Sequence, residues 1–359
     1  MPISKNIRTI LEAAIQAPSG ENAQPWSFRV SGTTIELYNL PDRDRSVYNW
    51  DQRGSYVAHG ALLENLTVAA QAQGYNAQVN LFPEGTQSNL VARIELTQVG
   101  TVTEITEPLY SFIAKRKTNR KPYKTTQITQ AQRSEILSAQ RTTDQAEMRL
   151  IENSEQIKTL ARVGSSNEEV MLSNEGLHNF FFSHITWTKK EDDEKKIGFY
   201  IKTLELQPPA EMMFKLIKNW SVMKIFNILG FPKIVGTQNA AINAQCAAIG
   251  GIFIDNINPE AYIAAGRLLE RTWLIVTKLG ISLQPLAGLL FMHLSLSQGD
   301  TTRFTEKNSQ IIKEQYSKVR GVFNIQNKIP VLMFRIGDGG EPSAQATRFR
   351  LEQILSQKT

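Results

Sequence analysis

The sequence has a single cysteine, Cys246, among its 359 residues. One thiol excludes an intramolecular disulfide and is typical of a protein kept in a reducing compartment. No apolar run approaches the roughly 18 to 20 residues that a membrane-spanning helix needs. Residues 1–18 contain neither a continuous apolar core nor the cleavage site of a secretory signal. We therefore expect a cytoplasmic protein with no membrane partner.

The usual signatures of side-chain catalysis are also missing. The sequence contains no H-E-x-x-H, G-x-S-x-G or P-loop motif, and its four histidines lack the spacing of metal ligands. Cys246 lies among small apolar residues, which suits packing better than nucleophilic attack. The glycines near the C-terminus form no dinucleotide fingerprint, because Pro342 stands where G-x-G-x-x-G needs its last glycine. Such a chain favours an organic cofactor that carries the chemistry itself.

Two stretches of the chain repeat one pattern. Residues 56–74 read "YVAHGALLENLTVAAQAQG" and residues 262–280 read "YIAAGRLLERTWLIVTKLG", and each closes on a glycine at the same offset. Apolar residues recur every three or four positions and the glycines suit helix ends, so we predict two helices. Strand-like segments flank both. Chance is the alternative, but the shared spacing favours a duplicated α+β unit, whose copies would pack as a pseudo-dimer within one chain.

Residues 11–30, "LEAAIQAPSGENAQPWSFRV", interrupt a helical pattern abruptly. Pro18 stops the helix by clashing with the preceding turn, and Ser19 to Asn22 offer small polar groups and free backbone amides. An ordinary helix-to-strand turn with Trp26 packed beside it is one interpretation. A loop that exposes polar groups to a ligand is the other.

Residues 107–123, "EPLYSFIAKRKTNRKPY", end in a dense basic and hydroxyl-rich segment. Guanidinium groups bind phosphate oxygens bidentately, and hydroxyl and amide groups complete the shell. A solvated basic turn is the alternative, and no aromatic interleaving supports a nucleic-acid patch, although the net charge of +6 favours anions in general. The residues that suggest a phosphate site are Arg116, Lys117, Thr118, Asn119 and Arg120.

Two segments of the second half also suggest contact with a ligand. In "GISLQPLAGLLF", residues 280–291, the small-residue turn from Gln284 to Gly288 would let the backbone approach a flat ligand, or it is simply a buried loop. The C-terminal "RIGDGGEPSAQATRFRLEQIL" follows a strand and carries Arg348 and Arg350 before an apolar finish.

Taken in order, these segments resemble the nitroreductase family of FMN-dependent oxidoreductases. "APSGENAQPW" is similar to that family's A-P-S-x-x-N-x-Q-P-W signature, and "KRKTNRKPY" to its R-R-S/T-x-R segment that grips the FMN phosphate. "QPLAG" resembles the P-x-E-G loop against the isoalloxazine, and "ATRFRLEQIL" the C-terminal segment with a phosphate-binding arginine. The resemblance is greatest to the single-chain, tandem Acg-like branch, and residues 185–250 match least.

The resemblance implies an α+β fold, a nitroreductase-like α-β-α sandwich of two repeated units in one chain. The first unit carries the P-S-x-x-N loop and the second the basic segment, so one composite FMN site per chain is expected, with Trp26 as support. The residues that the resemblance assigns to cofactor binding are Pro18, Ser19, Gly20, Asn22, Arg116, Lys117, Thr118, Asn119, Arg120, Pro285, Leu286, Ala287, Gly288, Arg348 and Arg350.

The resemblance also implies a function. An NAD(P)H-dependent flavin oxidoreductase would pass hydride through FMN to a small electron-poor acceptor such as a nitro compound or quinone, with no catalytic side chain and no metal. A non-catalytic flavin store is the alternative, and a basic nucleic-acid partner is a third reading that the motifs do not support. We expect a monomer that acts as a pseudo-dimer, with further dimerisation left open.

Two departures from the family pattern bear on these expectations. Ala287 replaces the glutamate of the P-x-E-G loop, which is harmless if only the backbone N–H is needed there. An insertion at about residues 187–245 separates parts of the second unit and either covers the flavin or packs between the units. Its polar positions do not fall on one helical arc, which argues against a membrane-surface helix. We expect units at residues 1–104 and 105–359.

Overall fold

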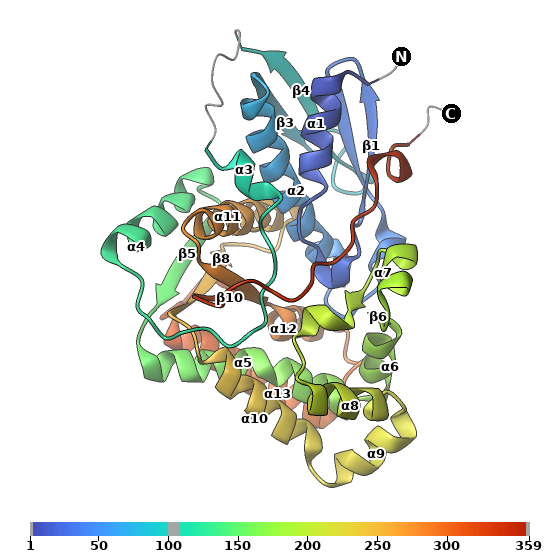
Figure 1. Cartoon of the computed structure of the whole chain (residues 1–359), viewed down its shortest axis with the longest axis vertical. Coiled ribbons are helices and arrows are strands. Elements are labelled where there is room, and N and C mark those ends of the chain that lie inside the picture. Colours follow the sequence, from blue (N-terminus) through green and yellow to red (C-terminus); the bar gives the residue numbers. More distant parts are fainter. Residues whose placement is uncertain (1–2, 100–107, 357–359) are drawn as a thin grey trace.

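The computed structural model describes residues 3–99 and 108–356, whose strands build two four-stranded antiparallel sheets, one in each half of the chain (Figure 1). The first sheet has the order β1-β2-β4-β3, and a tight turn that places Ser31 opposite Thr34 joins its first two strands. Its strands are β1 (Trp26–Ser31), β2 (Thr34–Asn39), β3 (Tyr75–Leu81) and β4 (Leu90–Gln98).

The second sheet has the order β5-β8-β10-β9, and its strand β8 is buried along its whole length. A strand buried on both faces reads as a continuous apolar run, as "AIGGIFI" does. A separate parallel pair of two-residue strands joins the chain just before the predicted insertion to a segment within it. The strands are β5 (Ala146–Ile151), β8 (Ala248–Ile254), β9 (Ser282–Leu286) and β10 (Ile329–Gly337), with β6 (Ile185–Thr186) and β7 (Phe199–Tyr200) apart.

The helices cover the sheets and join the two halves. α1 (Lys5–Ala14) packs with α2 (Arg53–Ala72) beside the first sheet, and α11 (Pro259–Lys278) crosses α2 at the centre of the molecule (Figure 1). The others are α3 (Tyr110–Ile113), α4 (Gln130–Leu137), α5 (Ser154–Ser173), α6 (Glu175–Ser183), α7 (Lys189–Lys195), α8 (Pro208–Ile217), α9 (Trp220–Ile228), α10 (Phe231–Asn243), α12 (Gly288–Ser297) and α13 (Glu306–Val322).

One hydrophobic core runs through both halves. It extends from Trp26 of β1, which is fully buried as its supporting role requires, through α2 and α11 to Phe334 of β10. A second core packs α5, α12 and α13 under the second sheet. The α+β class is confirmed, and the two sheets fit the predicted duplication. The predicted boundary between residues 104 and 105 lies outside the described residues, so the limits of the two units stay predictions.

The repeated pattern forms the crossing of α2 and α11. Both helices are 20 residues long, and Gly74 and Gly280 follow their ends with φ of 77° and 70°, as the sequence predicts. The inner glycines of the pattern meet face to face. A Cβ on Gly60 would lie 2.1 Å from the Ile263 carbonyl oxygen, and one on Gly266 would lie 2.0 Å from the Val57 carbonyl oxygen. These glycines therefore allow the two backbones to touch.

The crossing makes a first prediction. Gly60→Ala should lower the free energy of unfolding by about 1–3 kcal/mol, because the added methyl group meets backbone atoms that cannot move aside. Chemical denaturation of the purified variant measures the change. Gly321→Ala in α13, where no atom lies within 4 Å of the new Cβ, is the matched control and should stabilise by up to about 1 kcal/mol. Equal effects of the two substitutions would contradict the close crossing.

Among the described residues, no helix is both long and apolar enough to cross a bilayer. The predicted insertion contains four helices, α7 to α10, in place of one continuous helix. Lys218 and Asn219 separate α8 from α9, and Gly230, with φ of 73°, separates α9 from α10. The sequence argument against a membrane-surface helix treated this part of the insertion as one helix. Because the residues form separate helices, that argument does not apply to them.

Candidate functional site

A cleft lies where four segments distant in sequence meet. The loop after α1 and residues 116–120 form part of its wall, and residues 198–203 and 344–348 complete it, leaving a volume of about 80 Å³. The residues predicted to bind a cofactor that line this cleft are Pro18, Ser19, Asn22, Arg116, Lys117, Thr118, Arg120 and Arg348. The structure thus brings residues of both predicted units together, and their role in binding stays a prediction.

The loop after α1 has an unusual backbone conformation. α1 ends at Ala14, earlier than the predicted stop at Pro18, because the chain before a proline is pushed out of the helical region. Beyond the proline, Glu21, Asn22 and Gln24 adopt φ of 50°, 54° and 49°. Such left-handed conformations cost on the order of 1–3 kcal/mol each and gather at ligand clamps and active sites. The loop therefore holds strain where a ligand site is predicted.

Hydrogen bonds across the cleft fix this loop. The side-chain amide of Asn22 donates to the carbonyls of Lys196 (3.0 Å) and Thr347 (2.9 Å), and Arg348 donates to Asn22 Oδ1. Gln24 Nε2 donates to the same Lys196 carbonyl at 2.7 Å. These bonds tie the loop of the first unit to the insertion and to the C-terminal segment. A composite site needs such contacts between segments of both predicted units.

Arg116 lies in the wall of the cleft with its charge already paired. Its Nε is 3.0 Å from Glu270 Oε1, and both side chains are at most 3% exposed. Its Nη2 donates to the carbonyl of Gln16 at 2.8 Å, and its guanidinium lies 4.4 Å from the centre of the Trp273 ring. Burial raises the pKa of Glu270 to about 7, while Arg116 opposes that rise. Arg116 therefore ties the end of α1 to α11 as well as facing the cleft.

Two other guanidiniums line the cleft, and acidic side chains act on them only from beyond ion-pair distance: Glu168 and Glu205 on Arg120, and Glu270 and Asp192 on Arg348. Within residues 3–99 and 108–356, Arg120 and Arg348 form no ion pair. Arg120 Nη1 donates to the Thr203 carbonyl at 2.9 Å, whereas the buried Nε of Arg348 has no hydrogen-bond partner. Burial lowers the pKa of Arg120 to about 10 and that of Arg348 to about 9. Unpaired charge removed from water is costly, so the two groups favour a bound anion with several oxygens.

Several predicted residues support the cleft without lining it. Asn119 is buried and donates to the carbonyls of Gly339 (3.2 Å) and Gly340 (2.7 Å), and Arg350 is exposed. Ser19, which does line the cleft, accepts the backbone N–H of Gln24 at 2.9 Å and so braces the strained loop. The predicted residues outside the lining are Gly20, Asn119, Pro285, Leu286, Ala287, Gly288 and Arg350.

Residues 285–288 pack against α5, but they are the end of strand β9 and the start of α12, joined at Ala287, so the predicted turn from Gln284 to Gly288 is wrong. Leu286 contacts Gly164, and a Cβ on Gly288 would lie 2.2 Å from Asn167 Oδ1, so close packing accounts for this glycine. The neighbouring Glu168 interacts electrostatically with Arg120, which links this strand-to-helix junction to the cleft. An approach of this backbone to a flat ligand stays a prediction.

The sequence analysis expected the insertion to cover the flavin or to pack between the units, but it named none of the insertion residues that border the cleft. Gly198, Phe199 and Thr203 line it, and the Arg120 guanidinium lies 5.5 Å from the centre of the Phe199 ring. Gly198 has φ of 95°, and a Cβ there would lie 2.1 Å from the carbonyl oxygen of His184, so only glycine fits. A single glycine beside an aromatic pair carries no signal that sequence reasoning could have used.

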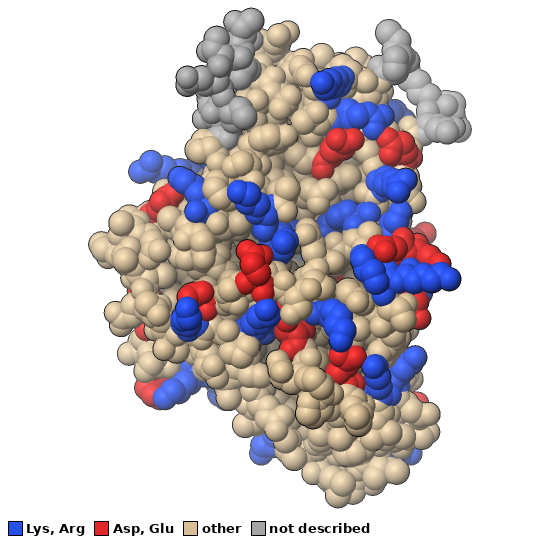
Figure 2. Space-filling view, in the orientation of Figure 1, with Lys and Arg blue, Asp and Glu red and all other residues tan. Residues whose placement is uncertain are grey.

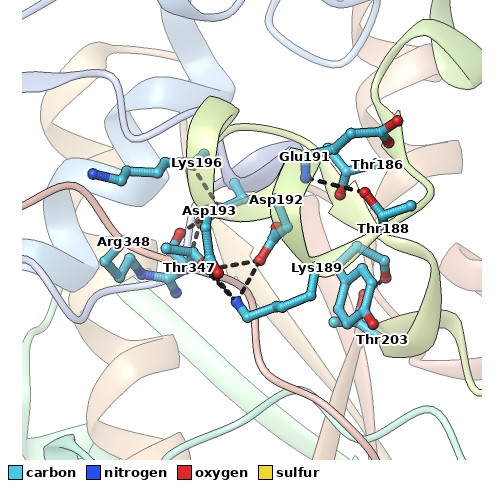
Figure 3. Close-up of polar contacts among 12 residues, drawn as sticks. Thr186, Thr188, Lys189, Glu191, Asp192, Asp193, Lys196, Thr203, Thr347 and Arg348 are labelled. Atoms are coloured by element: carbon cyan, nitrogen blue, oxygen red, sulfur yellow. Dashed lines mark hydrogen bonds and ion pairs between the residues drawn. The ribbon is translucent and has the colours of Figure 1, made fainter.

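A polar cluster holds α7 to the C-terminal segment, and we call Lys189, Asp192 and Thr347 the α7 latch. Figure 3 shows the three side chains pointing toward one another. Thr347 Oγ1 donates to Asp192 Oδ2 at 2.5 Å, and Lys189 Nζ lies 3.0 Å from the same oxygen and 2.8 Å from Thr347 Oγ1. Because Thr347 precedes Arg348, the latch positions a residue that lines the cleft.

Glu168 predicts a pH dependence of stability. Burial raises the pKa of this carboxyl to about 7, although a backbone hydrogen bond, Arg120 and Arg162 act against the rise. A folded-state pKa above the unfolded value means that folding favours the protonated form. Its stabilisation is complete below the unfolded pKa and is lost as the pH rises through about 7. In wild type, the titration of Glu168 should lower the free energy of unfolding by on the order of 2–3 kcal/mol between pH ~4.5 and ~8. Glu168→Gln should remove this fall.

Chemical denaturation of wild type and variant across this pH range measures the difference. Glu155→Gln, an exposed carboxyl at the start of the same helix, controls for the loss of a charge on α5. Glu270 contributes a fall of the same sign, so part of the pH dependence should survive in Glu168→Gln. A variant whose stability follows the same pH curve as wild type would contradict the assignment to Glu168.

No family model matches the chain. Two Mycobacterium tuberculosis proteins, named "Putative NAD(P)H nitroreductase Rv3131" and "Putative NAD(P)H nitroreductase acg", are 32% identical to it over 126 and 119 residues. These matches cover 34% and 33% of this chain and 35% of each relative. An uncharacterised M. tuberculosis protein is 22% identical over 279 residues, 77% of this chain and 38% of that protein. The matches thus span about a third of the length of these curated relatives.

Two solved structures also match. The FMN-dependent nitroreductase NfnB from Mycobacterium smegmatis, in complex with NADPH, is 12% identical with a TM-score of 0.42 and covers 70% of this chain and 98% of its own. A nitroreductase with bound FMN from Bacteroides fragilis is 12% identical with a TM-score of 0.35 and covers 71% and 95%. The sequence resemblance to the nitroreductases that the motifs indicated, with Acg itself among the relatives, is confirmed by the curated proteins.

Proposed function

We propose that the protein is an FMN-binding oxidoreductase that uses NAD(P)H and an electron-poor acceptor such as a nitro compound or a quinone. When bound, FMN would supply hydride transfer from the nicotinamide to the acceptor. The chain's own residues hold and orient the cofactor and exclude water from it. The proposal includes a cytoplasmic protein that acts as a single-chain pseudo-dimer with one composite site.

The observation that carries the proposal is a pair of guanidiniums that line one cleft and, within the described residues, form no direct ion pair. Arg120 and Arg348 come from segments far apart in sequence, and the buried Nε of Arg348 lacks any partner. The phosphate of FMN would satisfy both groups through charge-assisted hydrogen bonds. The strained loop at Glu21 to Gln24 supports the same site, since its backbone is fixed by bonds to the segments that carry these arginines. The residues present therefore fit the anionic end of the cofactor.

The size of the cleft favours a second candidate, a flavin store with little turnover. Its volume of about 80 Å³ is small beside the roughly 300–1,000 Å³ of ordinary ligand pockets. Entry of a whole flavin requires residues 198–203 or 344–348 to move, and the α7 latch holds the second of these segments. A cofactor enclosed in this way would be slow to meet a second substrate.

One experiment separates the two candidates. Protein purified with flavin should be yellow under both, and heat release followed by flavin quantification should give one FMN per chain. Anaerobic addition of NADH or NADPH should bleach the flavin within seconds if the protein is an oxidoreductase, and a nitro compound or quinone should restore the colour. A yellow protein that bleaches no faster than free FMN would be a store. A protein that binds no FMN, or binds two per chain, would contradict the composite site.

A further inference from the structure

The outer faces of α8, α9 and α10 carry exposed apolar side chains. Ile228 is 83% exposed, Met212 75%, Leu229 70% and Ile225 62%. The lower end of the molecule, where these helices lie in Figure 1, is almost uniformly tan in Figure 2, with blue side chains at its margins. We call the tip surface the set of Met212, Leu216, Ile225, Ile228, Leu229 and Ile234.

The fold does not need these outward side chains. The inward faces of the same helices already supply the packing, because Ile217 is 2% exposed and Met223 is fully buried. The Trp220 ring packs at a tilt against His178 with ring centres 5.1 Å apart, and the rings of Phe226 and Phe231 have centres 5.0 Å apart. Short helices that are apolar on both faces normally lie between two packed layers or against a membrane. Here no second layer of described residues packs over the outer face of α8, α9 and α10.

The charge around the tip surface is mainly positive, although Glu211 in the first turn of α8 pairs with Lys215 at 3.0 Å. The sequence has no Asp or Glu between Glu211 and Asp255, a stretch that contains Lys215, Lys218, Lys224 and Lys233. All four lysines are exposed. Clustered lysines beside an apolar face are the composition of segments that lie on anionic lipid, where the apolar groups enter the headgroup boundary and the cations meet phosphates.

This charge also argues against pairing of two copies through the same surface. A twofold contact would place the lysines of one tip against those of the other, and like charges repel. An anionic bilayer complements both features of the tip at once. It accepts apolar side chains without needing a matching shape, and it attracts the lysines.

We propose that the tip surface docks onto the surface of an anionic lipid bilayer, with α8, α9 and α10 lying at the headgroup boundary and no segment crossing it. This departs from the expectation of no membrane partner, which rested on the absence of a long apolar run and on a helical-arc argument that treated this part of the insertion as one helix. The inference does not rest on the proposed flavin chemistry, because neither the cleft nor any residue lining it takes part.

Vesicle co-sedimentation tests the proposal. Wild-type protein should sediment with vesicles of equal parts phosphatidylglycerol and phosphatidylcholine and stay in solution with phosphatidylcholine alone, and added salt should weaken the binding. The double variant Ile225→Ser, Ile228→Ser should bind at least about tenfold more weakly, because two large apolar side chains no longer enter the boundary. Its melting temperature should match wild type, since both residues are 62% exposed or more.

Val99→Ser is the matched control, because Val99 is 61% exposed beside the first sheet, far from the tip surface. Its vesicle binding should equal that of wild type. Failure of the wild-type protein to sediment with anionic vesicles would overturn the proposal. So would a double serine variant that binds them fully. If wild type instead forms a dimer, or binds polyglutamate and not vesicles, and the double variant loses that property, the tip surface serves protein contact and the membrane proposal is wrong.

Discussion

Arg116→Ala should lower the free energy of unfolding by about 3–5 kcal/mol, as expected when one member of a buried ion pair is removed. The substitution would remove the cation paired with the fully buried Glu270, which would keep only its weaker interaction with Arg348. It would also take the guanidinium away from the Trp273 ring and the Gln16 carbonyl. Since typical domains are stable by about 5–15 kcal/mol, this loss is a large share of the total. Chemical denaturation of the flavin-free protein measures it.

Two further variants show whether the orphaned charge is the cause. Replacing both partners, Arg116→Met with Glu270→Leu, should recover most of the lost stability, because an apolar pair of similar volume avoids burying a lone charge. Arg133→Ala, which breaks the more exposed pair with Glu152, should change the unfolding free energy by less than about 1 kcal/mol. A double variant no more stable than Arg116→Ala would mean that shape and the aromatic contact, rather than charge, hold Arg116 in place.

The contrast between Arg116 and Arg120 marks where sequence reasoning ends. Both stand in one basic segment and both match the same family motif, so the sequence assigns them the same role. The structure separates them, because Arg116 forms an ion pair with Glu270 on α11, whereas Arg120 donates to a backbone carbonyl and lies near the Phe199 ring. A partner so far along the chain is set by packing, which no local pattern records. The motif predicts where both arginines lie in the chain, but it does not predict which of them forms an ion pair with a carboxylate.

Features carried by local periodicity were predicted well. The two repeat helices and their closing glycines are confirmed, and the inner Gly60 and Gly266 turn out to be the point of contact between them. The path of the insertion was not predictable in the same way. Its helices break at Asn219 and Gly230 and fold back on α5, and the residues it contributes to the cleft, Gly198 and Phe199, resemble any turn before a strand. Long-range contacts decide such segments.

Arg348→Ala and Arg120→Ala should each weaken FMN binding roughly ten- to a hundredfold, since hydrogen bonds to a charged group contribute about 1.5–3 kcal/mol. Within the described residues the two side chains form no direct ion pair, so their positive charge is more available to a phosphate than that of the paired Arg116. Quenching of flavin fluorescence on titration with apoprotein gives the dissociation constants. Removing an unpaired, partly buried cation should leave the flavin-free protein as stable as wild type, or slightly more so.

Riboflavin separates phosphate recognition from general damage to the cleft. It lacks the phosphate, so wild type and both variants should bind it equally weakly, and the ratio of FMN to riboflavin affinity should collapse only in the variants. Arg350→Ala, an exposed neighbour two residues from Arg348, is the matched control and should keep the wild-type ratio. If both variants lose riboflavin as much as FMN, the arginines shape the cleft through Asn22 and Thr203 rather than binding phosphate. If neither ligand is affected, the cleft is not the flavin site, and the unpaired charges there serve a different anion.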